Sequence, residues 1–214
     1  MPTVFCDITT SIDGFVAGPN RTLEQPLGAG GEQLHEWAYE LASFRERHGK
    51  TGGKRGPDSD LLDESFERTG AIVMGRRMFS GGEGPWEDDP NADGWWGDEP
   101  PFRVQIFVLT HHARDRLELG EATFTFVTDG FESALERARA AAGSRDVAIA
   151  GGAAVVQQYM RAGLLDELQV HVAPLLLGGG VRLFGDVDRA PIRLEPARVL
   201  ESPAVVHLQY RLGR

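Results

Sequence analysis

Apolar and polar positions follow two spacings over about the first 160 residues, and together they predict alternating strands and helices. Short apolar runs rich in β-branched residues predict strands over Thr3 to Thr9, Ala71 to Gly75, Val104 to Thr110, Thr123 to Val127 and Val147 to Ala150. Helical spacing predicts helices over Glu32 to Arg47, Ser59 to Arg68 (capped by Ser59 or Asp60), Phe131 to Ala142 and Ala153 to Ala162. This alternation favours an α/β fold with parallel crossovers.

The last part of the chain changes to a period of two. Asp166 to Val172 and Ala204 to Leu212 alternate apolar with polar side chains, which is typical of antiparallel strands with one polar face. Ser202-Pro203 is a turn signal between Pro191 to Leu200 and the final run. We therefore expect a mixed, mostly parallel sheet that ends in an antiparallel C-terminal hairpin.

Three segments depart from these patterns. Glycine-rich His48 to Pro57 holds both lysines of the chain and predicts a mobile basic loop. Gly81 to Pro101 is an insert in which Glu83 to Glu99 carries seven acidic residues, three tryptophans and no Lys or Arg. Ala173 to Asp186 contains three successive glycines, after which Val181 to Phe184 is expected to close back on the sheet as architecture.

Composition and charge narrow the function classes. With 214 residues, the chain fits a single domain over residues 1–214, and its net charge of −10 argues against nucleic acid as a partner. No apolar run approaches the roughly 20 residues of a membrane helix. Cys6 is the only cysteine and the start lacks a signal-peptide pattern, so we expect a cytoplasmic protein. No CxxC, HExxH or paired Cys/His spacing occurs, and we infer no metal site.

Two predicted strands end in residues suited to phosphate. Arg76 and Arg77 follow Gly75 at a strand end, where open α/β sheets bind ligands, although surface arginines are the alternative. Gly151-Gly152 lies between a strand and a helix, which suits a pyrophosphate at the helix N-terminus or else a simple tight turn.

Other strand ends carry weaker signals. Thr110 can donate to a phosphate, while His111 and His112 after it are better explained as exposed loop histidines. Asp13-Gly14 is a turn signal, which we favour over a catalytic role for Asp13.

Asp7 is the candidate for acid–base chemistry. It lies inside a predicted strand, so its carboxylate must be paired, open to a cleft, or shifted to a higher pKa. Both a structural and a functional role are compatible with that position.

Five segments, in order, resemble the dihydrofolate reductase-like reductases that include the C-terminal reductase domain of bacterial riboflavin biosynthesis. They are SIDGFVAG, VMGRRMF, FVLT, IAGGAAVVQQY and DELQVHVAPLLLGGGVRLF. The resemblance implies an α/β dihydrofolate reductase-like three-layer fold, NADPH bound across the strand ends, and a homodimer. It places Val16 and Ala17 beside the nicotinamide, Gly75, Arg76 and Arg77 near the 2′-phosphate, Leu109 and Thr110 beside the adenine ribose, and Gly151, Gly152, Ala153 and Ala154 under the pyrophosphate.

The substrate half departs from true dihydrofolate reductases. Their acidic residue at the start of the first helix has three rival counterparts here, Glu32, His35 and Glu36, so folate reduction is not expected. Asp7 aligns near the pocket of the reducible ring, and we expect it to orient or protonate the substrate. The proton comes either from Asp7, as an acid kept protonated by an apolar pocket, or from an ordered water. Trp95 and Trp96 either stack on a flat substrate from a lid or pack the insert onto the domain or a second subunit.

The expected function is NADPH-dependent hydride transfer to a small heterocyclic, imine or carbonyl substrate. A first alternative is a 5-amino-6-(5-phosphoribosylamino)uracil-type reductase of riboflavin biosynthesis, against which the long acidic insert argues. Others are a non-catalytic nucleotide-binding protein of the same fold and an interaction protein that docks through the insert.

Overall fold

A nine-stranded mixed sheet forms the centre of the computed structural model, which describes residues 2–185 and 191–213. Its order is β10-β11-β8-β1-β7-β3-β4-β6-β5. The six strands from β8 to β6 run parallel, while the β10–β11 hairpin and β5 add antiparallel edges. The strands are β1 (Val4–Ser11), β3 (Thr69–Gly75), β4 (Gln105–Leu109), β5 (Leu117–Leu119), β6 (Ala122–Val127), β7 (Asp146–Gly151), β8 (Glu167–Ala173), β10 (Leu194–Glu201) and β11 (Val206–Leu212). The predicted mixed α/β fold with a C-terminal hairpin is confirmed.

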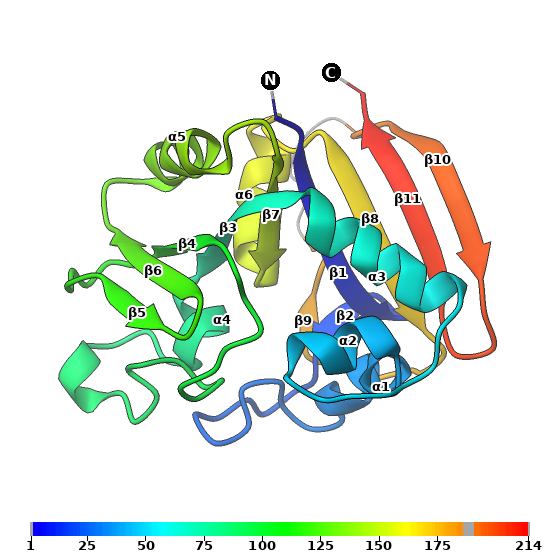
Figure 1. The fold of residues 1–214 in the computed structure, drawn as a ribbon, viewed down its shortest axis with the longest axis horizontal. Coiled ribbons are helices and arrows are strands. Elements are labelled where there is room, and N and C mark those ends of the chain that lie inside the picture. The colour runs from blue at the N-terminus through cyan, green and yellow to red at the C-terminus, as the bar shows by residue number, and fades with distance from the viewer. Residues whose placement is uncertain (1, 186–190, 214) are drawn as a thin grey trace.

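The two faces of the sheet have separate coverings (Figure 1). Alternate residues of β1 such as Val4 and Cys6 point to the face packed by α5 (Phe131–Ala142) and α6 (Ala153–Arg161). Asp7 points to the opposite face, which α3 (Pro57–Arg68) crosses. This two-sided burial creates the three layers, and it places Asp7 in the interior beneath α3.

The predicted helix over Glu32 to Arg47 is wrong as a continuous element. The segment forms η1 (Gly31–His35), α1 (Glu36–Tyr39) and α2 (Ala42–Arg47), with Leu41 extended between the last two. Backbone hydrogen bonds join Lys54 to Glu40 and to Ala42. The basic loop therefore interrupts the helix by pairing with its backbone, and this loop is fixed at Lys54.

Other local differences have simple causes. Helix α3 begins at Pro57 after Gly56, before the expected caps Ser59 and Asp60, because proline suits the first helical turn. A short helix α4 (Arg76–Ser80) directly follows β3, and η2 (Trp86–Asp88) lies in the insert.

Val181 to Phe184 was expected to join the main sheet and does not. Its first residues form β9 (Val181–Arg182), which pairs with β2 (Phe15–Ala17) in a separate two-stranded sheet. The end of the predicted segment Ala173 to Asp186 lies outside the described residues. The small sheet holds Val16 and Ala17 in place beside the strand ends of the large one.

Gly180→Ala should destabilise this small sheet. Gly180 has φ +123°, and an added Cβ would overlap the Ala17 carbonyl oxygen and lie 2.7 Å from Gly18 C. We expect about 1–3 kcal/mol lower stability in urea unfolding, from overpacking and backbone strain. Gly179→Ala is the matched control, because a Cβ there meets nothing within 4 Å. Equal stability of the two variants would contradict the close approach at Gly180.

Candidate active site

Two cavities adjoin on the sheet: one lies over the middle of the central strands, and the other lies beside the carboxyl end of β7. The Asp7 cavity, of about 330 Å³, lies beneath α3 and is mostly apolar; the diglycine groove, of about 470 Å³, passes Gly151 and Gly152. They share Ile8, Thr9, His35, Phe44, His48, Met78, Pro101, Phe102 and Ala150 as lining residues. A molecule in the groove would therefore contact a molecule in the cavity.

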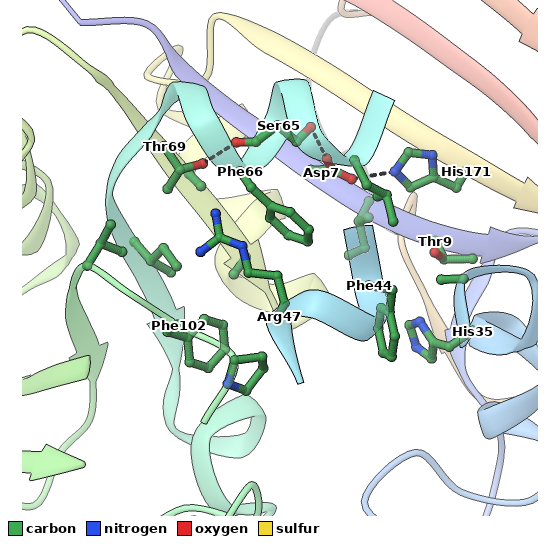
Figure 2. A pocket seen from close by; sticks show the side chains of 18 of the residues that line it. Asp7, Thr9, His35, Phe44, Arg47, Ser65, Phe66, Thr69, Phe102 and His171 are labelled. Carbon is green, nitrogen blue, oxygen red and sulfur yellow. Dashed lines mark hydrogen bonds and ion pairs between the residues drawn. The ribbon is translucent and has the colours of Figure 1, made fainter. Parts of the chain in front are cut away.

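Asp7 lies at the wall of its cavity within a ring of hydrogen-bond donors (Figure 2). Ser65 Oγ of α3 donates to Asp7 Oδ2 at 2.5 Å, and Gln169 Nε2 of β8 donates to the same oxygen at 2.8 Å. His171 Nε2 contacts the other oxygen, Oδ1. The pairing of β1 with β8 places Asp7 beside Gln169 and Thr9 beside His171, so the strand register builds this ring.

These donors keep Asp7 ionised. Burial alone raises the pKa of Asp7, but the charge and hydrogen bond of His171, together with the hydrogen bond from Ser65, lower it below its ordinary value. The expectation that an apolar pocket keeps Asp7 protonated is therefore wrong. The resting carboxylate can hold a cationic or N–H-bearing substrate, and a proton for the reaction must reach it from a neighbour.

His171 and His207 are site residues that the sequence interpretation left on a polar strand face. His171 lies opposite His207 in the β8–β11 pair, and their Nδ1 atoms are 2.5 Å apart. His207 Nε2 lies 3.2 Å from Asp58 Oδ1 of α3. Trp37 covers both imidazoles, with ring centroids at 4.8 and 5.1 Å. The polar face predicted for these strands is thus buried, and its side chains form a network of contacts instead of facing solvent.

The remaining walls of the Asp7 cavity are mostly apolar and include four phenylalanines. Phe5, Phe44, Phe66 and Phe102 line it. The guanidinium of Arg47 lies 4.5 Å from the Phe66 ring centroid, and burial followed by the nearby charge of Arg103 lowers the pKa of Arg47. Flat apolar walls with a carboxylate on one side suit a planar heterocycle.

The diglycine groove passes the turn at which the sequence predicts a pyrophosphate. A cis peptide bond joins Gly151 to Gly152 between β7 and α6, and Gly151 has φ +122°. An added Cβ on Gly152 would meet nothing within 4 Å, so this backbone faces open space. The groove is lined by six of the residues that the resemblance assigns to the cofactor: Val16, Ala17, Arg77, Gly151, Gly152 and Ala153. Their convergence offers backbone N–H groups and the first turn of α6 to a bound anion.

The arginines that line the groove are not the pair, Arg76 and Arg77, that the sequence predicted there. Arg77 lines it together with Arg21, and Arg77 forms an exposed ion pair with Glu83. Burial and the charge of Arg77 lower the pKa of Arg21. Arg76 instead points away from the groove and beneath the insert. There its Nη2 lies 2.6 Å from Asp89 Oδ2, and its Cζ lies 3.5 Å from the Trp86 ring centroid.

Several other expected cofactor residues do not line either cavity. Gly75 is packed against Val155, whose Cγ2 would lie 2.9 Å from an added Cβ. Thr110 Oγ1 accepts a hydrogen bond from the His112 N–H at 3.1 Å. Like Arg76, the residues Gly75, Leu109, Thr110 and Ala154 are absent from the lining of both cavities.

Some of the residues predicted to bind the substrate line a cavity, and others do not. Glu32 lines the groove, His35 lines both cavities, and Glu36 lines neither. Burial and then the charge of His171 lower the pKa of His35 to about 4, so this imidazole is neutral near neutral pH. Asp13 accepts hydrogen bonds from the backbone of Leu177 and Gly178, which agrees with its interpretation as a turn residue.

Trp95 and Trp96 line the groove while they anchor the insert. Trp95 Nε1 donates to the Met78 carbonyl oxygen at 2.6 Å, and the ring centroids of Trp96 and Phe102 are 4.9 Å apart. Packing of the insert onto the domain therefore forms one wall of the groove.

Within residues 2–185 and 191–213, no three His, Cys, Asp or Glu side chains come together in an arrangement that could hold a metal ion. Within the same ranges, no helix is long and apolar enough to span a bilayer.

Comparison with known proteins identifies the family. The model of the RibD C-terminal domain matches residues 2–208. The riboflavin biosynthesis protein RibD of Corynebacterium ammoniagenes is 37% identical over 97 residues, which is 43% of this chain and only 27% of that protein. A provisionally assigned riboflavin biosynthesis protein from Shewanella sp. PV-4 has a similar structure, with TM-score 0.62 and 20% identity over 100% of both chains. A pyrimidine reductase-like protein from Corynebacterium diphtheriae gives TM-score 0.56 and 17% identity over 100% of this chain and 92% of that one. At such identities the solved structures establish a common fold, and the match over residues 2–208 shows that this chain belongs to the family of RibD C-terminal domains, which have the dihydrofolate reductase-like fold.

Proposed function

We propose that this protein is an NADPH-dependent reductase that transfers a hydride to a small heterocyclic, imine or carbonyl substrate. The observation that carries the proposal is the junction of the two cavities, where a groove with the diglycine turn meets a carboxylate-bearing aromatic cavity along shared walls. Membership in the family of RibD C-terminal domains supports reduction as the reaction class.

The groove fits a nicotinamide dinucleotide. Gly151 and Gly152 leave space for a pyrophosphate beside the first turn of α6, and Val16 and Ala17 would lie beside the nicotinamide. When bound, this cofactor supplies the hydride. The chain itself orients the substrate against Asp7, excludes water with Phe44 and Phe102, and holds a proton at His171 Nε2.

Arg77 is the residue we expect to select NADPH over NADH. It lines the groove beside Arg21, and a guanidinium suits the 2′-phosphate. Arg77→Gln should weaken NADPH binding by about tenfold and leave NADH binding nearly unchanged in a fluorescence titration, since one charge-assisted contact is lost. Arg116→Gln is the matched control, because Arg116 also forms an exposed pair with a glutamate, Glu118, outside both cavities. Equal effects of Arg77→Gln on both dinucleotides would contradict this assignment.

A 5-amino-6-(5-phosphoribosylamino)uracil-type substrate is a second candidate, favoured by Arg47 and Arg103 in the lining of the Asp7 cavity. Two guanidiniums near an aromatic wall suit a heterocycle with a phosphate-bearing arm. Cofactor oxidation should be measured against aminouracil ribosyl phosphates, pterins, quinones and imines. Turnover of the aminouracil alone selects this candidate, whereas cofactor binding without turnover of any compound indicates a non-catalytic binder.

We propose that the protein forms a homodimer, as the family resemblance implies, and that it acts on a small molecule in the cytoplasm. Leu194, Val199 and Val206 are exposed on the β10–β11 hairpin, and this apolar surface at a sheet edge supports self-association. Light scattering measures the mass directly.

A further inference from the structure

Four titratable side chains form a line from the Asp7 cavity to the surface. Asp7 contacts His171, and His171 contacts His207 through facing Nδ1 atoms at 2.5 Å. His207 then contacts Asp58, which lies in the first turn of α3. Both imidazoles are fully buried, whereas Asp58 keeps 17% of its side chain exposed to solvent. The line thus connects the reacting side of the cavity to solvent through the interior.

The protons on this line can be counted from its acceptors. Each imidazole faces a carboxylate through Nε2, and an ionised carboxylate only accepts, so each Nε2 must carry a hydrogen. The two Nδ1 atoms lie 2.5 Å apart, which requires one hydrogen between them. The pair then holds three N–H protons, one more than two neutral imidazoles hold. A mobile proton is therefore stored next to ionised Asp7.

The surroundings favour a single stored charge. Burial and the charge of His171 lower the pKa of His207 in spite of Asp58, so the two imidazoles do not both carry a charge near neutral pH. His35 faces His171 from η1 as a neutral ring, and Trp37 of α1 adds no charge. On the β10 side, Arg198 is paired with Glu64 of α3 at 2.8 Å.

We propose that Asp58, His207 and His171 form a relay that delivers to Asp7 the proton consumed in the reaction while the substrate covers the cavity. The relay rests on the proposed function. In one turnover, His171 Nε2–H first passes its proton to ionised Asp7. Protonated Asp7 gives this proton to one substrate atom while the neighbouring atom gains the hydride, which leaves Asp7 ionised again. The imidazole pair then returns to three N–H protons by taking one from solvent at Asp58. The net reaction consumes one solvent proton and yields oxidised cofactor and reduced substrate.

Asp58 and His207 are positioning residues on this view, and their loss should slow proton delivery without affecting binding. In single turnovers, Asp58→Asn and His207→Gln should lower the hydride-transfer rate by about tenfold or more, with KM and cofactor affinity nearly unchanged. The solvent deuterium isotope effect on that rate should rise. In wild type, kcat should fall as pH rises and the stored proton is lost, and this inflection should move in Asp58→Asn.

Asp60→Asn is the matched control, because it removes an equal charge from the same first turn of α3 while Asp60 lies exposed outside the line. Asp58 is partly exposed, so its variant keeps the test valid if His207→Gln fails to fold. An unchanged rate and isotope effect in Asp58→Asn would overturn the relay.

A measurement on the resting protein separates the relay from the reductase proposal. Nitrogen-15 NMR of labelled histidines should show three protonated nitrogens on His171 and His207 near neutral pH, and a shift of His207 in Asp58→Asn. Two protonated nitrogens would overturn the relay whatever the activity. If no substrate is reduced, the proposed function fails, while the NMR count still decides whether the proton is stored.

Discussion

Asp7→Asn is expected to lower kcat/KM by about 10²–10⁴-fold, the usual contribution of a positioned acid–base group. The variant cannot carry the transferred proton. Its amide NH2 group would also face another hydrogen-bond donor, either Ser65 and Gln169 in one orientation or His171 in the other. Cofactor affinity should change little, because Asp7 lines the Asp7 cavity and not the diglycine groove. Steady-state kinetics and a cofactor titration measure the two quantities.

Asp13→Asn is the matched control for Asp7→Asn. Asp13 also accepts a hydroxyl hydrogen bond, from Ser11 at 2.6 Å, together with two backbone hydrogen bonds, but it lines neither cavity. Similar losses of kcat/KM in both variants would show a general structural effect and remove Asp7 from the chemistry.

The pKa of Asp7 also sets a pH dependence of stability. Its folded pKa lies below the ordinary value of about 3.9, so ionised Asp7 stabilises the fold at neutral pH. This contribution is lost as pH falls through the folded pKa. Urea unfolding of Asp7→Asn should therefore show a smaller loss of stability on acidification than wild type.

Asp89→Asn is expected to lower the free energy of unfolding by about 3–5 kcal/mol, since it leaves the Arg76 guanidinium buried without its counter-charge. Arg76 and Asp89 are 6% and 4% exposed. Burial raises the pKa of Asp89, yet the hydrogen bonds from the Ser80 hydroxyl and the Asn91 backbone N–H, together with the adjacent Arg76 guanidinium, lower it more; burial lowers the pKa of Arg76 in spite of Asp89. Burial disfavours the ionised form of both side chains, so each needs the opposite charge of the other to stay ionised.

Urea unfolding of Asp89→Asn should be compared with that of Asp88→Asn, an exposed neighbour whose loss should change stability little. The double variant Arg76→Met/Asp89→Leu should regain most of the loss, because no unpaired charge stays buried. A double variant as unstable as Asp89→Asn would mean that the insert depends on the charges themselves.

The diglycine half of the site was predictable because its determinants are local. Gly151 and Gly152 separate a β-branched strand from a helix in consecutive residues, so the chain itself fixes their position at a strand end. The choice between adjacent arginines was not local. Helix α4 begins at Arg76 and turns its side chain under the insert while Arg77 reaches the groove, and the partner Asp89 lies 13 residues along the chain.

The buried histidines had a signal that the alternating pattern obscured. Gln169-Val170-His171 and His207-Leu208-Gln209 are mirror images, and antiparallel pairing sets His171 against His207 and Gln169 against Gln209. Such self-matching polar positions indicate a network, not a solvated face. The broken helix at Leu41 had no comparable signal, since its cause is the distant backbone of Lys54.

The shared walls of the two cavities have a consequence for inhibitor design. Fragments that occupy the Asp7 cavity and the diglycine groove separately would meet at His35 and Phe102. Joined by a short link, they would lose translational and rotational freedom once instead of twice, so the linked compound gains affinity without any new contact. The junction of the cavities, and not either cavity alone, is therefore the part of this fold best suited to a selective ligand.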